Sequence, residues 1–316
     1  MAEASERIKT ASGSAHSVAT FSTPNWLKIV RRIPHAVRLI SLPAVAISAF
    51  AIAPIMAIVM WSFWTWDPLT YWIKPEFSMA GYLAILEAGR WSVIVSSLVK
   101  AAVTALICLA IGFPTAYVIH FIAGPRLRLV LQALITLPFL TSYLIRGFSW
   151  RLVLGREGLI NNSLIQLGLI DEPLDWLLFS DFAVVIGLIA SYLPFATFPL
   201  LLAMRRVEPS YLAAAQDLGA SFTIIVRTIL LPLTKSGLLA GFLFVLIMVL
   251  GASSEVQMLG GAGASIVSIM ISDVMRVANF PLAFAVSTVV MLLIFLSLLV
   301  ISRYVGLSKL FEDSTR

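Results

Sequence analysis

The stretch Leu212–Pro232, LAAAQDLGASFTIIVRTILLP, lies between two apolar runs of membrane-spanning length. Its three consecutive alanines favour a first short helix, and Gly219 is placed to end that helix in a left-handed conformation. Ser210, which follows Pro209, is a predicted cap for this helix, and Ser221 is a predicted cap for a second helix. We call residues 211–232 the knuckle, because they predict two short helices bent at one glycine.

The second helix of the knuckle carries an apolar stripe at helical spacing. The stripe consists of Phe222, Ile225, Val226, Ile229 and Leu230. One interpretation is an amphipathic helix that lies on the membrane surface. The other is a docking surface through which a soluble motor subunit moves the membrane part. Small side chains on both sides of the bend favour docking, because they let another backbone approach closely; they belong to Ala213, Ala214, Ala215 and Ala220.

The composition places this knuckle in a membrane protein. Of the 316 residues, 60% are hydrophobic and 12% are charged, whereas a typical soluble chain has about 25% charged residues. The mean hydropathy is +0.98, and the apolar residues form runs long enough to cross a bilayer as helices. We therefore expect an all-α membrane protein with six transmembrane helices. The expected spans are Leu39–Trp61, Val93–Phe121, Leu129–Phe148, Phe182–Ala203, Gly237–Leu259 and Leu282–Ile301.

The distribution of charge predicts the orientation of these spans. With the N-terminus inside, 15 of the 22 Lys and Arg residues and 6 of the 16 acidic residues fall on the inner side, in accord with the positive-inside rule. The net charge of +6 therefore reflects topology rather than a nucleic-acid partner. The predicted organisation is a cytoplasmic N-terminal tail at 1–38, a transmembrane domain at 39–303 with an inner loop at 205–236, and a cytoplasmic C-terminal tail at 304–316.

Two long connections, Thr65–Ser92 and Arg151–Asp181, face outside in this topology. The first is dense in aromatic residues. These residues are interpreted either as an interfacial aromatic belt or as an outer surface that receives another protein.

The sequence offers little for enzymatic or metal chemistry. The phosphate-binding pattern GxxxxGK[ST] is absent, as are a nucleophile elbow and HExxH. His16, His35 and His120 lack the spacing of metal ligands. The lone Cys108 lies in an apolar run and is interpreted as a small buried hydrophobe rather than a reactive thiol. We expect no catalytic residue, no metal site and no cofactor in this chain.

Ionisable groups within membrane spans are costly and usually functional. Glu255 is predicted toward the outer side of the fifth span, where a carboxylate suits a cationic substrate; a structural ion pair, for example with Arg146, is the alternative. Arg146 equally suits an acidic outer partner or an anionic substrate. Asp273 either adds negative potential at the outer mouth, or is solvated or caps a helix. Three aromatic residues either offer their faces to an ammonium group or serve ordinary packing, namely Tyr143, Trp150 and Tyr192.

The knuckle resembles the EAA loop of ABC importer permeases, whose pattern is roughly E-A-A-x-x-x-G-x(9)-I-x-L-P. The matching residues are Ala214, Ala215, Gly219, Ile229, Leu231 and Pro232. Ala213 stands where the family usually has glutamate, and Asp217 is a nearby acid that can supply a charge. Other blocks resemble the first permease subunit of spermidine/putrescine-type importers, so the resemblance covers roughly residues 77–302. These blocks are Leu137–Asn161, Leu167–Phe195 and Leu259–Gly261.

The resemblance implies a type I importer permease fold in a bacterial inner membrane, with both termini cytoplasmic. It implies a second permease subunit that completes a heterodimer, two ATPase subunits that bind ATP and Mg, and a periplasmic substrate-binding protein. ATP binding by the partner is expected to move the knuckle, and the expected substrate is a small polyamine-like cation. Another organic solute or a metal complex is the alternative within this class. An ion-coupled secondary transporter without an ATPase, or an intramembrane enzyme, is the alternative outside it.

Overall fold

The computed structural model describes residues 33–87, 89–261 and 264–305. The chain divides into two units, Met1–Ala57 and Ile58–Arg316. Of the predicted tails at 1–38 and 304–316, all but residues 33–38, 304 and 305 lie outside the described residues. In chain order the elements are α3 (Ile33–Trp61), β1 (Thr65–Asp67), β2 (Trp72–Lys74), α4 (Ala80–Leu86), α5 (Arg90–Tyr117), η1 (Val118–Ile122), α6 (Pro125–Leu140), α7 (Tyr143–Leu154), α8 (Leu159–Gln166), η2 (Asp175–Leu177), α9 (Asp181–Met204), α10 (Pro209–Asp217), α11 (Phe222–Ile225), η3 (Val226–Leu230), α12 (Leu231–Leu233), α13 (Lys235–Gly251), α14 (Ser254–Gly260), α15 (Val267–Arg276) and α16 (Phe280–Val305).

The first unit contains most of helix α3, which includes the predicted span at 39–61. Several of its large apolar side chains are exposed, among them Val45, Ile47, Phe50 and Ile52. An apolar helix with such a surface is typical of a segment that contacts lipid or another subunit.

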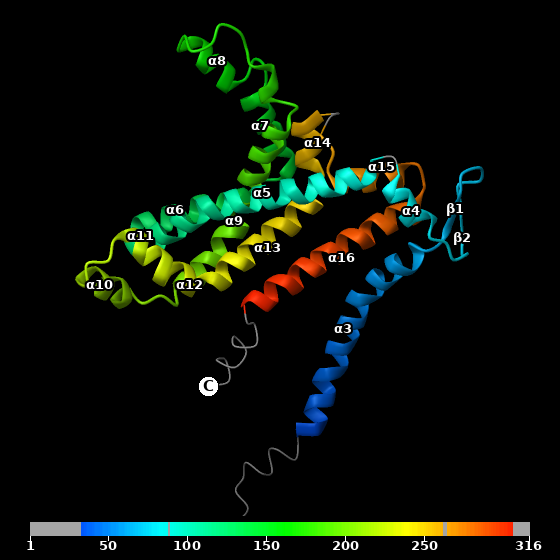
Figure 1. Ribbon diagram of the computed structural model, residues 1–316, viewed down its shortest axis with the longest axis horizontal. Helices are drawn as coiled ribbons and strands as arrows, with labels where there is room; N and C mark the ends of the chain where they lie inside the picture. The colour runs from blue at the N-terminus through cyan, green and yellow to red at the C-terminus, as the bar shows by residue number, and fades with distance from the viewer. Residues whose placement is uncertain (1–32, 88, 262–263, 306–316) are drawn as a thin grey trace, which may run out of the picture. The chain divides into compact units, whose positions relative to one another are not determined.

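Helices α5, α9 and α13 pack side by side and form the centre of the second unit (Figure 1). Small residues bring their backbones close together: Gly112 of α5 faces Thr197 of α9, and Gly241 of α13 faces the backbone of Ala196. Lipid supplies no hydrophobic driving force between helices, so close packing of this kind holds them together. Cys108 is fully buried among these helices, as expected for a small hydrophobe.

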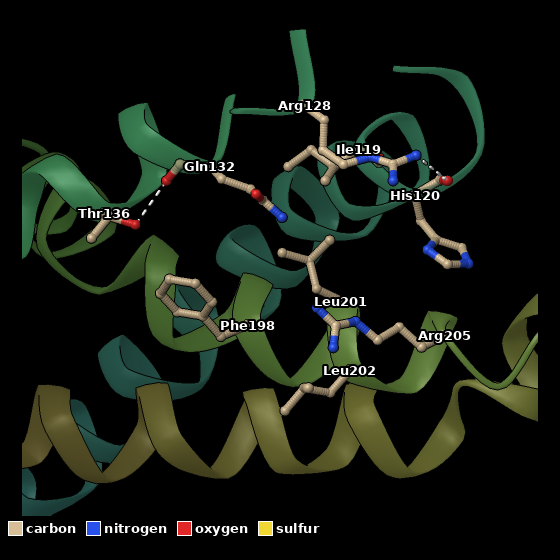
Figure 2. A pocket seen from close by; sticks show the side chains of 9 residues that line it. All are labelled: Ile119, His120, Arg128, Gln132, Thr136, Phe198, Leu201, Leu202 and Arg205. Atoms are coloured by element: carbon tan, nitrogen blue, oxygen red, sulfur yellow. Dashed lines mark hydrogen bonds between the residues drawn. The ribbon is translucent and has the colours of Figure 1, made fainter. Parts of the chain in front are cut away.

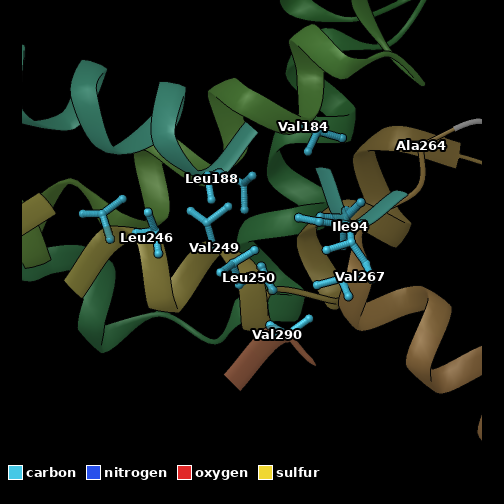
Figure 3. Close-up of a cluster of buried hydrophobic side chains, with 14 of the residues drawn as sticks. Ile94, Val184, Leu188, Leu246, Val249, Leu250, Ala264, Val267 and Val290 are labelled. Carbon is cyan, nitrogen blue, oxygen red and sulfur yellow. The ribbon is translucent and has the colours of Figure 1, made fainter. Parts of the chain in front are cut away.

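Branched aliphatic side chains extend this core to α15 and α16 (Figure 3). Ile94 of α5, Val184 of α9 and Val249 of α13 are buried in one cluster with Val267 of α15. The Val267 amide donates a buried hydrogen bond of 2.9 Å to the Ser97 hydroxyl of α5. This bond fixes the start of α15 against the core.

Among the described residues, three helices are long and apolar enough to cross a membrane: Arg90–Ile122, Asp181–Met204 and Phe280–Val300. They correspond to the predicted second, fourth and sixth spans. Two bent helix pairs raise the number to as many as five, and the apolar part of α3, Val45–Trp61, is shorter. The all-α membrane fold is confirmed, whereas the number of six spans stays a prediction.

The prediction of the third span, Leu129–Phe148, as one helix is wrong. The structure divides this run between α6 and α7, and α6 meets the segment that begins with α7 at 104°. Pro138 interrupts the hydrogen bonding of the last turns of α6. Ser142 then caps α7 by accepting a hydrogen bond of 3.3 Å from the Leu144 amide. The apolar run is continuous in sequence, but the proline and the cap end one helix and start another.

The prediction of the fifth span, Gly237–Leu259, as one helix is also wrong. Helix α13 stops before Ala252, whose backbone is extended and whose carbonyl accepts a hydrogen bond of 2.6 Å from the Ser268 hydroxyl. Gly251, Ser253 and Ser254 have lower helix propensity than alanine, so ending the helix here costs little free energy. Glu255 therefore lies in the first turn of α14 and not deep within a long helix.

The two long connections contain regular structure that the sequence analysis did not predict. Strands β1 and β2 pair antiparallel, with Thr65 opposite Lys74, and α4 follows them. In the second connection, the buried Asn161 of α8 accepts a hydrogen bond of 2.8 Å from the Leu174 amide and donates one of 3.4 Å to the Leu174 carbonyl. One buried side-chain amide thus holds this connection together.

Candidate functional site

The first helix of the knuckle, α10, begins two residues earlier than its predicted cap requires. Pro209 occupies the first helical position, where a residue without an N–H is well tolerated, and Glu208 occupies the cap position. Ser210 lies inside the helix, and its hydroxyl donates a hydrogen bond of 3.1 Å to the Glu208 carboxylate. The prediction that Ser210 caps α10 is therefore wrong.

The bend of the knuckle is built as predicted. Gly219 has a φ of +78°, in the left-handed region. Its amide donates to the Gln216 carbonyl at 2.8 Å, and the Ala220 amide donates to the Ala215 carbonyl at 3.0 Å. These two bonds form a Schellman motif, which satisfies the last carbonyls of a helix and needs a glycine at the turn.

The second helix of the knuckle is not a regular α-helix. It starts as α11, continues as the π-helical segment η3 and ends as α12. Ser221 occupies the cap position as predicted, but its side chain makes no capping hydrogen bond. Ile225 and Leu230 are buried, Val226 and Ile229 are partly buried, and Phe222, the first residue of the predicted stripe, is exposed.

A hydrophobic cluster anchors the knuckle to the end of α5. Leu212 of α10, Ile225 of α11 and Leu230 of η3 are buried together with Val207. Three aromatic residues from α5 and η1 pack against them, namely Phe113, Tyr117 and Phe121. The knuckle is therefore in direct contact with α5, one of the three helices at the centre of the second unit.

The opposite surface of the knuckle is exposed. Leu218 is 88% exposed and Phe222 is 59% exposed. Of the residues predicted to couple to an ATPase, five are exposed: Ala213, Ala214, Asp217, Gly219 and Pro232. The other three are partly buried: Ala215, Ala220 and Ile229. Within the described part of the chain, the Asp217 carboxylate has no hydrogen-bond or ion-pair partner.

A second candidate site is the ion pair between Arg146 of α7 and Glu255 of α14. The Arg146 Nη2 lies 3.0 Å from the Glu255 Oε1, and the two side chains are only 17% and 7% exposed. The Arg146 Nη1 donates to the Pro138 carbonyl at 3.0 Å, while its buried Nε has no hydrogen-bond partner. The structure thus contains the ion pair that the sequence analysis gave as the alternative role of Glu255.

Glycines make the packing around this pair tight. Gly147, next to Arg146, faces the thioether of Met258 on α14. Gly187 of α9 faces Leu259 on the same short helix. At either glycine a β-carbon would overlap the facing side chain, so α14 lies in direct contact with both α7 and α9.

Of the aromatic residues predicted on the substrate path, Tyr192 of α9 interacts electrostatically with the pair. It is partly buried and lies within coulombic reach of both Arg146 and Glu255. Tyr143 and Trp150 lie on α7 before and after Arg146; Tyr143 is exposed, and Trp150 packs against the core.

The remaining acid predicted near the path lies elsewhere. Asp273 of α15 is exposed and pairs with Arg276 at 3.5 Å. Lys100, a charged residue within α5, pairs with Asp181 at the start of α9 at 2.6 Å. The structure therefore brings Arg146, Glu255 and Tyr192 together and leaves Asp273 apart from them.

A cavity of about 390 Å³ between η1, α6 and α9 was missed by the sequence analysis (Figure 2). Arg128, Gln132 and Thr136 of α6 line it, together with His120 of η1 and Arg205 at the end of α9. The signal in the sequence is the recurrence of polar residues at every fourth position of an otherwise apolar helix, which places them on one face. Among the described residues, no group of three or more His, Cys, Asp or Glu is arranged to hold a metal ion.

Comparison with known proteins places this architecture among transport proteins. Residues 109–308 match the family described as "Binding-protein-dependent transport system inner membrane component". The chain is 34% identical over 239 residues to the spermidine/putrescine transport system permease protein PotB of Haemophilus influenzae, a match that covers 75% of this chain and 82% of that protein. It is 31% identical over 255 residues to the protein of the same name from Escherichia coli, covering 80% and 92% of the two chains.

The fold has a solved counterpart. A chain in the crystal structure of a bacterial alginate ABC transporter in complex with alginate pentasaccharide-bound periplasmic protein superposes with a TM-score of 0.69. The two chains share 18% sequence identity, and the match covers 88% of this chain and 96% of the other. At this level of identity the likeness concerns the fold alone.

Proposed function

The chain belongs to the binding-protein-dependent transport system inner membrane component family, and on this premise we propose that it imports a small organic cation of the spermidine and putrescine class. It is a membrane-embedded permease subunit of an ABC importer. The observation that carries the proposed substrate is the similarity to two spermidine/putrescine permeases, at 34% and 31% identity over most of the chain.

The proposed assembly contains a second permease that forms a heterodimer with this chain, two ATPase subunits and a periplasmic substrate-binding protein. ATP and Mg bind to the ATPase subunits, since the sequence lacks the GxxxxGK[ST] pattern that cradles phosphates. This chain then has no catalytic role of its own and needs no cofactor. It converts movements of the ATPase subunits into opening and closing of a path for the substrate.

In the proposed orientation both termini and the knuckle are cytoplasmic. The excess of Lys and Arg on this side supports it. The exposed surface of the knuckle docks into a groove of an ATPase subunit. Leu218 and Phe222 supply apolar contact area, Ala213 and Ala214 permit close approach, and the unpartnered Asp217 supplies the charge that the glutamate of related loops supplies.

The cation is proposed to pass Glu255. Arg146 occupies this carboxylate in the described structure, so an ammonium group reaches it only when α7 and α14 separate. A buried charge without a partner is strongly unfavourable, and Arg146 and the substrate therefore compete for one carboxylate. Tyr192 offers a ring face to the ammonium group at the same place. Tyr143, Trp150 and Asp273 remain predictions on this route.

The test is uptake by a reconstituted system. The chain is co-expressed with an ATPase, a second permease and a periplasmic binding protein of the same transporter class, in cells that lack their own polyamine uptake. Labelled putrescine and spermidine should accumulate, and a substitution that abolishes ATP hydrolysis in the ATPase should stop accumulation. The proposal is contradicted if uptake persists without ATP hydrolysis, or if neither cation is taken up.

A further inference from the structure

The cavity between η1, α6 and α9 is lined by cationic and neutral side chains alone. Arg128, Arg205 and His120 form its polar side (Figure 2). No Asp or Glu is among its lining residues, so within the described part of the chain this concentration of positive charge has no countercharge in the cavity. Charges of one sign at a helix interface are unfavourable unless a ligand of the opposite sign compensates them.

The two arginines of the cavity have different roles. Arg128 is held by the backbone: its Nε donates to the Ile119 carbonyl at 3.0 Å, and its Nη2 donates to the carbonyls of His120 and Ala123 at 3.3 and 3.4 Å. It thus satisfies the last carbonyls of η1 and stays fixed. Arg205 has no hydrogen-bond or ion-pair partner within the described residues, and its planar group of donors is available to a ligand.

Apolar side chains line most of the rest of the cavity. This part, away from the cationic side chains, is lined by Ile119, Phe198, Leu201 and Leu202. The Gln132 side chain makes no hydrogen bond within the described residues and adds a neutral donor. A ligand that fits both parts has an anionic head with several acceptor oxygens and an apolar body attached to it.

We propose that this cavity binds the phosphate group of an anionic phospholipid from the leaflet that faces the knuckle, with Arg205 as its main contact. Arginine binds phosphate oxygens with two parallel donors, and basic pockets between membrane helices on the cytoplasmic side are suited to lipid headgroups. The acyl chains then continue over the exposed apolar surface of α6. In the orientation of the proposed function this is the cytoplasmic leaflet, and binding at the cavity does not otherwise depend on that function.

Native mass spectrometry of the full-length permease, purified with its partner subunits and delipidated, tests this site. The probes are phosphatidylglycerol and phosphatidylcholine with identical acyl chains. We expect clear retention of phosphatidylglycerol over phosphatidylcholine, and Arg205→Gln should reduce that retention about tenfold, the effect of losing one or two charge-assisted hydrogen bonds. Arg205 is exposed and makes no contact that the fold needs, so the variant should assemble normally.

The matched control is Arg206→Gln, which removes the same charge from the neighbouring residue, outside the cavity. It should leave retention unchanged. Equal retention of the two lipids, or equal losses in the two variants, overturns the proposal. If an excess of inorganic phosphate displaces the lipid, the cavity is a site for a free anion. If phosphatidylglycerol is preferred over phosphatidylcholine only when the partner permease is absent, the cavity is a contact between subunits. Either result also overturns the proposal. Polyamine uptake is an independent readout, so failure of the proposed transport function would appear with lipid retention intact.

Discussion

The knuckle and the Arg146–Glu255 pair are both built at interruptions of apolar helices, and they differ in what they leave exposed. At the pair, two charged side chains are buried and lie 3.0 Å apart. At the knuckle, Leu218 and Phe222 are exposed although both are apolar. Within the described residues, each charge of the pair therefore has its partner, whereas Leu218 and Phe222 of the knuckle are left largely uncovered.

This difference indicates where each region is expected to act. Covering an exposed leucine or phenylalanine is worth ~1.5–3 kcal/mol per side chain, and at the knuckle this free energy becomes available only when a second protein binds. At the pair the interaction is complete within the chain, so any function requires that it first be broken. Docking should thus depend on the surface of the knuckle, and substrate passage on the exchange of one ionic partner for another.

The largest effect is expected for Glu255→Gln, which removes the carboxylate of the buried pair. The variant leaves Arg146 buried without a countercharge, and removing one partner of a buried pair costs ~3–5 kcal/mol. We expect a lower unfolding temperature of the purified protein and a loss of cation uptake per inserted molecule. An unchanged uptake rate removes Glu255 from the path.

A double variant, Arg146→Gln with Glu255→Gln, separates stability from transport. It leaves no unpaired charge, so most of the stability should return. If Glu255 meets the substrate, uptake stays about tenfold or more below the wild type, the cost of a lost charge-assisted contact. Uptake that recovers together with stability would mean that the pair is purely structural.

The next largest effect is expected for Gly219→Val. A β-branched residue in the left-handed region costs ~1–2 kcal/mol, which opens the bend and should lower ATP-driven uptake about tenfold through a smaller population of the docking conformation. Membrane insertion, measured by the amount of protein in washed membranes, should be retained.

The matched control is Gly168→Val. Gly168 ends α8 with a φ of +66°, and it has the same two hydrogen bonds, to Ile165 from its own amide and to Leu164 from the Leu169 amide. At both glycines a β-carbon would meet no atom within 4 Å. The two variants therefore carry the same local strain. Equal losses of uptake would show that the strain itself, and not the position in the knuckle, causes the defect.

A smaller effect is expected for Leu218→Ser, which changes the surface of the knuckle without changing its backbone. Loss of the apolar contact should weaken association with the ATPase by about tenfold, consistent with ~1.5 kcal/mol of unburied side chain. Binding of the purified ATPase to the permease, measured by a titration, checks this. Leu167→Ser alters the corresponding residue before Gly168, which is 72% exposed, and it should leave binding unchanged.

The smallest effect is expected at the exposed counterpart of the buried pair, the Asp67–Lys74 contact of 3.3 Å between β1 and β2. The Leu69 amide donates to the Asp67 carboxylate and, with Thr70 and Lys74, holds the pKa of Asp67 below its ordinary value. Because the folded pKa is the lower one, the stabilisation is complete above the ordinary value of about 3.9 and is lost as the pH falls through the folded pKa. A carboxyl NMR titration should give a depressed midpoint, and Asp67→Asn at neutral pH should lower the unfolding temperature only slightly, because ion pairs near the surface contribute little to stability.

The sequence predicts well what depends on neighbouring residues. Long apolar runs identify the membrane-helical class, and a glycine after three alanines identifies the bend at Gly219. The breaks before Ser142 and after Gly251 escape this reasoning, because a window of about 20 residues averages over short interruptions. The break after Gly251 also depends on Ser268, a residue from a different helix.

The candidate sites show the same limit. The sequence identifies Arg146 and Glu255 as unusual charges, but their contact joins residues 109 positions apart, and only the packing of α14 against α7 brings them together. In the knuckle, an α-helical period predicts a stripe that includes Phe222. The structure buries Ile225 and Leu230 of this stripe and leaves Phe222 exposed. The two buried residues lie five positions apart, which is the spacing of π-helical hydrogen bonds, and η3 is π-helical.

The π-helical segment η3 also sets the angle at which the next residues of the same helix, those of α12, are presented. A π-helical turn contains about one residue more than an α-helical turn, and one residue corresponds to a rotation of about 100°. A deletion that rewound η3 as an α-helix would turn the exposed Leu231 and Pro232 of α12 around the helix axis. The effect ends at the 71° bend before α13, so the extra residue in η3 specifies which side of the knuckle its last two exposed residues occupy.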